Sequence, residues 1–133
     1  MKLIKSIASV LVFAGLTSAS SVHAQQSSPL QRTDLVQNDI TAPGLQVVQA
    51  RVDFKKDAVS IKHSHPGEEV AYVLKGSIEY QLEGRPPVTL KTGEALFIPA
   101  GVAHVARNVG EGEASELATY VVKKEGALVV PEK

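Results

Sequence analysis

The chain has 133 residues with 14 basic and 14 acidic side chains and no cysteine, a length that suits one domain. The balanced charge argues against a nucleic-acid partner, because such proteins need a basic field. The missing cysteines exclude disulfides, thiolate metal sites and a cysteine nucleophile.

Residues 1–24 have the composition of a secretory signal peptide. Two lysines precede an apolar run at residues 7–16, and small residues lead up to Ala24. A membrane anchor is the alternative, but the run is far shorter than the ~20 residues that a spanning helix needs. We expect cleavage after Ala24, with Ala19 as the second choice. Residues 25–133 then form one domain in the bacterial periplasm, without membrane contact.

Short segments rich in β-branched residues alternate with glycine and proline turns in the remaining chain. Residues 31–40 favour one helical turn or an edge strand. The strands expected after them are residues 45–54, 58–65, 69–76, 77–84, 88–93, 94–101, 102–110 and 116–124. Segments of this length and spacing predict an all-β sandwich or barrel.

Three histidines remain once the signal peptide is removed, and they form the main chemical signal of the chain. His63 and His65 stand two residues apart, which places them on the same face of a strand. Glu69 opens the next expected strand, and His104 follows a Pro-Ala-Gly turn. Imidazole nitrogens and a carboxylate are suitable ligands for Fe, Mn, Ni, Cu or Zn. The alternative is that the histidines are polar strand residues that face solvent.

Two spaced motifs resemble those of the cupin superfamily. His63-x-His65-x3-Glu69-x6-Gly76 is similar to the first cupin motif, and Gly93-x5-Pro99-x-Gly101-x2-His104-x3-Asn108 is similar to the second. The family usually has a glycine six residues before the first histidine, where this chain has Asp57. Aspartate tolerates turn conformations, so we interpret this as a substituted turn that leaves every ligand in place.

The resemblance implies a conical β-barrel, also called a double-stranded β-helix or jelly roll. It also implies one divalent transition metal per chain, held by His63, His65, Glu69 and His104. The motif spacing selects Glu69 over its neighbour Glu68, which then points outward.

Other motif residues are interpreted as structural. The glycines are expected at turns, Pro99 is expected to shape the turn before His104, and Asn108 is expected to close a loop by hydrogen bonding.

The sequence predicts the residues that line the pocket less specifically than it predicts the metal ligands. We expect a small, mostly apolar pocket with no arginine placed near the metal. Residue patterns do not decide whether Tyr80 or Gln81 faces the cavity. Further candidates for the lining, which core packing explains equally well, are Val59, Ile61, Phe97 and Ala106.

The chain resembles small, quercetin-dioxygenase-like bacterial cupins, which implies a metal-dependent oxygenase that acts on a small organic substrate. In that function Glu69 is both a metal ligand and a catalytic proton acceptor. One alternative is a metal-dependent lyase or isomerase for a sugar or organic acid, and another is a non-catalytic metal or small-molecule binding protein. We also expect a homodimer, formed through edge strands near the N-terminus or through the tail at residues 121–130.

Overall fold

A computed structural model describes residues 28–133, and the expected signal peptide lies outside the described residues. Within this range no helix is long and apolar enough to span a membrane. The strands are β1 (Leu30–Asp39), β2 (Leu45–Phe54), β3 (His63–Ser64), β4 (Gly67–Lys75), β5 (Ser77–Leu82), β6 (Val88–Lys91), β7 (Ala95–Ile98), β8 (His104–Asn108), β9 (Ala114–Lys123) and β10 (Val130–Pro131). The predicted all-β class is confirmed.

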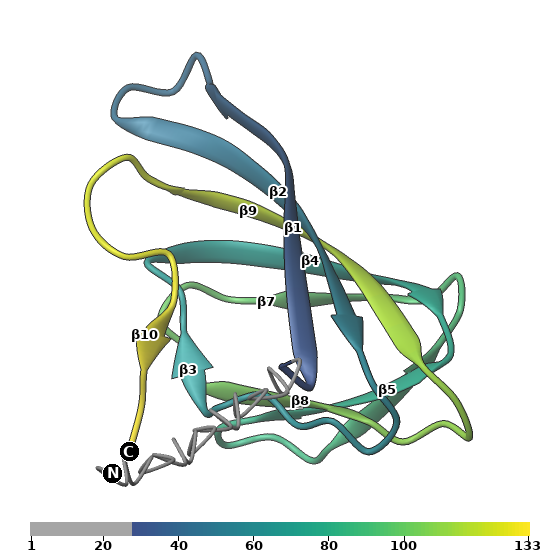
Figure 1. Ribbon diagram of the computed structural model, residues 1–133. Coiled ribbons are helices and arrows are strands. Elements are labelled where there is room, and N and C mark those ends of the chain that lie inside the picture. Colours follow the sequence, from purple (N-terminus) through teal and green to yellow (C-terminus); the bar gives the residue numbers. More distant parts are fainter. Residues whose placement is uncertain (1–27) are drawn as a thin grey trace, which may run out of the picture.

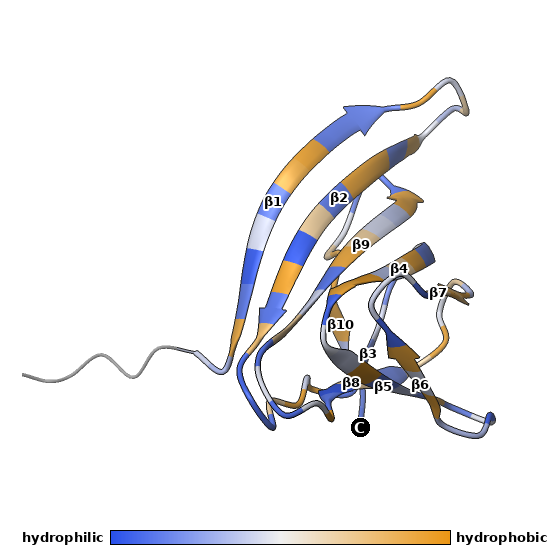
Figure 2. Cartoon of the chain, turned by 90° about the vertical axis from the view of Figure 1, so that its right-hand side faces the viewer, coloured by the Kyte–Doolittle hydropathy of each residue, from blue (hydrophilic) through white to orange (hydrophobic). Residues whose placement is uncertain are grey.

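The strands form two five-stranded antiparallel sheets that face each other (Figure 1). One sheet has the order β1-β2-β9-β4-β7 and the other has the order β10-β3-β8-β5-β6. Figure 2 shows the first sheet curving around the second, with hydrophilic and hydrophobic bands alternating along β1 and β2. Two facing sheets with these crossovers make the predicted jelly-roll barrel, whose core lies between them.

Strand β4 shows why the motif spacing selects Glu69. Residues on a strand alternate between the two faces of the sheet. Glu69 is buried and Glu68 is exposed, so the inward face is the one the spacing predicts. Ala71 and Val73 are fully buried on the same face, while Tyr72, on the opposite face, is exposed.

The structure resolves one open expectation about the strands and corrects another. Residues 31–40, left open between a turn and an edge strand, fall almost entirely in edge strand β1. The predicted strand at 58–65 is wrong over most of its length, because only His63–Ser64 joins a sheet. An isolated bridge between Val59 and Arg107 and a hydrogen bond from Ser60 N to the carbonyl of Ala106 hold this segment instead.

The turns behave as the motif interpretation predicts. Gly76, Gly93 and Gly101 all have positive φ. Asp57 also has a positive φ of 62°, which confirms that it occupies the turn position where the family usually has glycine. Asn108 is 1% exposed, and its amide donates to the carbonyls of Lys55 and Gly112 at 3.0 and 2.8 Å. It therefore closes the loop after β8, as predicted.

Gly67 is required because β4 and β9 approach each other closely beside the site. It lies opposite Val122, and a Cβ at this position would stand 2.0 Å from the carbonyl oxygen of Val121. That neighbour is backbone, so only a shift of one strand could relieve the clash. We expect Gly67→Ala to lower the free energy of unfolding by about 1–3 kcal/mol, the usual cost of overpacking.

Denaturant unfolding measures this effect. Gly112→Ala is the matched control, since a Cβ there meets nothing within 4 Å and its φ is not positive. Equal stability of the two variants would contradict the close approach.

Candidate metal centre

The three histidines come together from both cupin-like motifs. His63 on β3 pairs directly with His104 on β8, and His65 follows β3. Their ring centroids lie 4.4 to 5.2 Å apart, and one nitrogen of each ring lies within 4.8 Å of the other two. His65 and His104 are each 3% exposed. This burial contradicts the alternative that the histidines are solvent-facing strand residues.

Backbone carbonyls fix the tautomer of each ring. Nδ1 of His63 lies 2.8 Å from the carbonyl oxygen of Ile61, and Nδ1 of His104 lies 2.9 Å from that of Val102. Nδ1 of His65 lies 2.7 Å from the carbonyl oxygen of Leu128. A carbonyl oxygen only accepts, so each Nδ1 carries a hydrogen, and each Nε2, which points inward, is the nitrogen left to bind a metal. Ring orientation by such an outer hydrogen bond is typical of metal-ligating histidine.

Glu69 brings a carboxylate oxygen to the same point. Its Oε2 lies 3.0 Å from Nε2 of His65 and 3.4 Å from Nε2 of His104. Oε2 of Glu69 and Nε2 of His65 are nevertheless buried without a hydrogen-bond partner. Two facing acceptor atoms repel each other unless a cation lies between them. Ligand atoms at a right angle on a metal, each ~2.1 Å away, would themselves be ~3 Å apart, so the residues fit a metal ion.

The pKa shifts give the ligating forms of these groups. Burial alone would raise the pKa of Glu69, but the imidazoles of His104 and His65 that face its carboxylate outweigh burial and lower the pKa to about 2. Burial, together with the neighbouring imidazoles, lowers the pKa of His63. At neutral pH the site therefore offers a carboxylate and a neutral His63, which are the forms that bind metal. Burial would lower the pKa of His104, but Glu69 and the carbonyl of Val102 outweigh it and raise the pKa, so a metal at this nitrogen competes with a proton.

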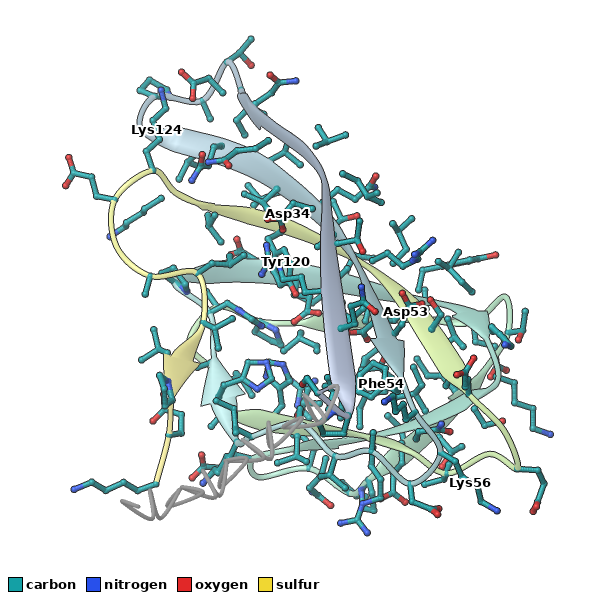
Figure 3. All side chains as sticks on the ribbon, in the orientation of Figure 1. Asp34, Asp53, Phe54, Lys56, Tyr120 and Lys124 are labelled. Atoms are coloured by element: carbon teal, nitrogen blue, oxygen red, sulfur yellow. The ribbon has the colours of Figure 1, made fainter. Side chains whose placement is uncertain are left out.

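A cavity of about 390 Å³ opens onto the cluster. Its lining residues are Ser28, Pro29, Leu30, Arg32, Val52, Phe54, Val59, Ser60, Ile61, His63, His65, Glu69, Tyr80, His104, Ala106, Glu116, Tyr120 and Val129. Figure 3 shows Phe54 on β2 and Tyr120 on β9 within the space that the sheets enclose. A larger hollow of about 530 Å³ near Lys75 contains no histidine, so volume alone does not locate the site.

The lining corrects two expectations. Val59, Ile61 and Ala106 reach the cavity, but Phe97 is 55% exposed and does not. Arg32 does line the cavity, contrary to the expectation of a pocket without a placed arginine. Its guanidinium lies 5.9 Å from the ring centre of Tyr120 and forms an ion pair with Asp34 at 2.7 Å. The sequence does not place Arg32 at the cavity, because the pattern of residues 31–40 fits either a helical turn or an edge strand.

Sequence reasoning missed Glu116 and left open whether Tyr80 or Gln81 faces the cavity. Tyr80 faces inward, and its hydroxyl donates a hydrogen bond to Oε2 of Glu116. Burial, followed by the charge of Glu69, raises the pKa of Glu116 to about 7. The signal that could have found Glu116 is its place in β9, two and four residues before the inward-facing Ala118 and Tyr120.

The raised pKa of Glu116 makes stability depend on pH. Below pH 4.5 the carboxyl is protonated in both states, and between pH 4.5 and about 7 the folded protein keeps a proton that the unfolded chain loses. The contribution of Glu116 to stability therefore falls as pH rises through this window. In metal-free protein, Glu116→Gln should gain stability relative to wild type by up to about 3 kcal/mol between pH 5 and pH 8.

Urea unfolding at the two pH values tests this expectation. Glu113→Gln is the control, because Glu113 is exposed. A difference between Glu116→Gln and wild type that stays constant with pH would contradict the raised pKa.

The C-terminal tail contributes to the site through its backbone. Strand β10 pairs with β3, so Val130 lies opposite Ser64, and the carbonyl of Leu128 accepts the Nδ1 hydrogen of His65. Removing residues 127–133 should weaken metal binding about 10–100-fold, the usual cost of losing an outer hydrogen bond to a ligand. Competition with a chromophoric chelator measures the change, with removal of Lys133 alone as the control. Unaltered affinity in the shorter chain would show that the tail does not orient His65.

Comparison with known proteins agrees with this geometry. Residues 50–120 match the family model described as Cupin domain. The dimethylsulfoniopropionate lyase DddQ of Ruegeria pomeroyi is 42% identical over 45 residues, which cover 34% of this chain and 22% of the lyase. Oxalate oxidase GF-2.8 of Triticum aestivum is 30% identical over 95 residues, which cover 65% of this chain and 42% of the oxidase.

The fold is similar to solved structures as well. The crystal structure of DddQ from Ruegeria pomeroyi DSS-3 matches with a TM-score of 0.66 and 25% identity, covering 86% of this chain and 59% of that chain. In the sequence comparisons, this chain spans less than half the length of the two relatives: 22% of the lyase and 42% of the oxalate oxidase.

Proposed function

Because the chain belongs to the cupin family, we propose that it binds one divalent transition metal through His63, His65, His104 and Glu69 and is a metal-dependent dioxygenase for a small organic substrate. The observation that carries the proposal is the convergence of three oriented imidazoles and a partnerless buried carboxylate oxygen beside a cavity. Iron, manganese, nickel, copper and zinc all suit this donor set.

A bound redox-active metal would supply Lewis acidity toward a substrate oxygen and electron exchange with dioxygen. The chain's own residues supply the rest. Apolar side chains such as Phe54 and Ala106 exclude water around the substrate. Glu69, ionised at neutral pH, is the group that would accept a proton from a hydroxyl or enol of the substrate beside it.

Oxygen uptake tests the proposed reaction. Protein loaded anaerobically with Fe(II), Mn(II), Ni(II) or Cu(II) is given oxygen with diketones, flavonols and catechols as substrates. We expect uptake with at least one pair of metal and substrate, with both oxygen atoms recovered in the product. Absence of uptake with every metal would rule out the oxygenase.

The hydrogen-bonded pair of Tyr80 and Glu116 favours a second candidate, a metal-dependent lyase or isomerase. These groups can move protons in the cavity without any redox change. One relative is named a lyase and another an oxidase, so both reaction classes occur among similar proteins. Turnover of a sugar or organic acid with Zn(II) in the absence of oxygen would support the lyase or isomerase, and turnover that needs oxygen would exclude it.

We also propose that residues 1–24 direct export to the periplasm, on the basis of their composition. Mass spectrometry of protein from a periplasmic extract should find Gln25 at the N-terminus. A full-length chain confined to the cytoplasm would contradict export.

A homodimer is proposed from two exposed features. Strand β1 is a long edge that pairs only with β2 among the described strands, and the tail instead pairs with β3 of its own chain. On the outer face of the first sheet, Val70 lies beside Phe97, and the two side chains are 44% and 55% exposed. Light scattering after size exclusion should give twice the chain mass, and a monomer would contradict this.

A further inference from the structure

Glu116 and Tyr80 form a buried polar pair that metal binding does not use. Glu116 lies on β9 and Tyr80 lies on β5, so the hydrogen bond between them joins the two sheets across the barrel interior. Glu116 is 5% exposed and Tyr80 is 1% exposed, yet both line the same cavity as the imidazoles. The pair is therefore hidden from bulk solvent but accessible to a molecule in the cavity.

The hydrogen bond with Tyr80 leaves most of the capacity of Glu116 unused. A carboxylate has about four acceptor positions, and the Tyr80 hydroxyl occupies one of them. A donor on a molecule bound in the cavity can take one of the acceptor positions that remain. The carboxyl of Glu116 is thus prepared to accept a hydrogen bond.

The position of the pair sets the shape of its ligand. Tyr80 lies opposite Ala106, which is two residues beyond His104 on the same face of β8. Two residues on a strand correspond to about 7 Å along the backbone, so the strand positions of Tyr80 and His104 are separated by about the length of one aromatic ring. The wall between them is largely apolar and includes Phe54 and Val52.

Charge in the cavity disfavours a second carboxylate beside the pair. Above about pH 7 Glu116 is ionised, and the cation at the cavity wall, Arg32, is already paired with Asp34. A ligand carboxylate placed against the ionised Glu116 would meet repulsion in a site of low dielectric.

We propose that Glu116 and Tyr80 form a second subsite of the cavity, which binds a hydroxyl or amino donor at the far end of the substrate and disfavours a carboxylate there. The inference rests on the proposed metal-dependent function, because the metal holds the other end of the same molecule. The substrate class is a compact aromatic or aliphatic molecule with a metal-binding oxygen at one end and a neutral or cationic donor at the other.

Three small carboxylates serve as probes, and calorimetry measures their binding to the metal-loaded protein. They are 4-hydroxybenzoate, benzoate, which lacks the far hydroxyl, and terephthalate, which carries a second carboxylate in its place, all at pH 8. We expect 4-hydroxybenzoate to bind wild type about tenfold more tightly than benzoate, as for a hydrogen bond to a charged group. Terephthalate should bind more weakly than either.

Substitutions of Glu116 and Tyr80 test whether these residues cause the preference for 4-hydroxybenzoate over benzoate. Glu116→Met keeps the volume but not the acceptor, so the two benzoates should bind within about twofold of each other. Glu116→Gln should reduce the preference for 4-hydroxybenzoate and improve terephthalate binding, and Tyr80→Phe should also reduce the preference. Glu113→Gln, outside this cavity, should behave as wild type. Circular dichroism confirms that each variant is folded.

The outcomes separate this inference from the proposed reaction. Equal binding of the two benzoates by wild type, or a full preference in folded Glu116→Met and Tyr80→Phe, would overturn the subsite. Because binding is measured without turnover, a protein that consumed no oxygen could still show the preference.

Discussion

His104→Ala should lower the affinity for a divalent transition metal by more than about 100-fold, since loss of an outer hydrogen bond to a ligand alone costs 10–100-fold. The side chain of His104 is 2% exposed, its Nδ1 is held by the carbonyl of Val102, and its Nε2 lies 3.4 Å from Oε2 of Glu69. The substitution removes one of four donors and leaves space that water can enter. Competition against a chromophoric chelator measures the dissociation constant.

Arg107→Ala is the matched control for His104→Ala. Arg107 is exposed and belongs to the same strand, β8, so its loss should leave the dissociation constant unchanged. Unfolding curves of both variants separate lost binding from lost structure. A folded His104→Ala protein with wild-type affinity would show that the imidazole is not a ligand.

Glu69→Gln should weaken metal binding and, even at saturating metal, lower turnover about 100-fold or more, the usual contribution of a general base. The amide retains the size of the side chain but loses the negative charge, and it cannot accept the substrate proton at neutral pH. Oxygen uptake with the best pair of metal and substrate measures the turnover.

Glu68→Gln provides a control that differs by one position. Glu68 is exposed on the outer face of β4, while Glu69 is 3% exposed on the inner face. The same loss of charge at residue 68 should therefore change neither affinity nor turnover. Equal effects of the two substitutions would mean that the charge acts only at long range, and not as a ligand or base.

Local patterns predicted the parts of the site that lie on regular strands. The alternation along β4 separates Glu69 from Glu68, and the positive φ of Asp57 shows that the turn persists without glycine. His63 and His65 come together although only His63 belongs to a strand, because β10 and the carbonyl of Leu128 hold the segment. The motif spacing therefore predicted correctly that these histidines lie together, although the strand predicted at residues 58–65 was wrong over most of its length.

The rest of the cavity depends on contacts between residues distant in sequence. Arg32 reaches the cavity because β1 pairs along β2, and Tyr80 meets Glu116 because the sheets close on each other. Neither residue lies in a spaced motif, and a buried glutamate is rare enough that sequence alone favours exposure. Only the register of the strands places these side chains in one cavity.

Elemental analysis tests the metal centre most directly. Protein purified without chelators from its native cells should contain one transition metal per chain, and His104→Ala purified in parallel should contain almost none. Full metal occupancy in that variant, or a wild-type protein that neither carries nor takes up a transition metal, would contradict the account.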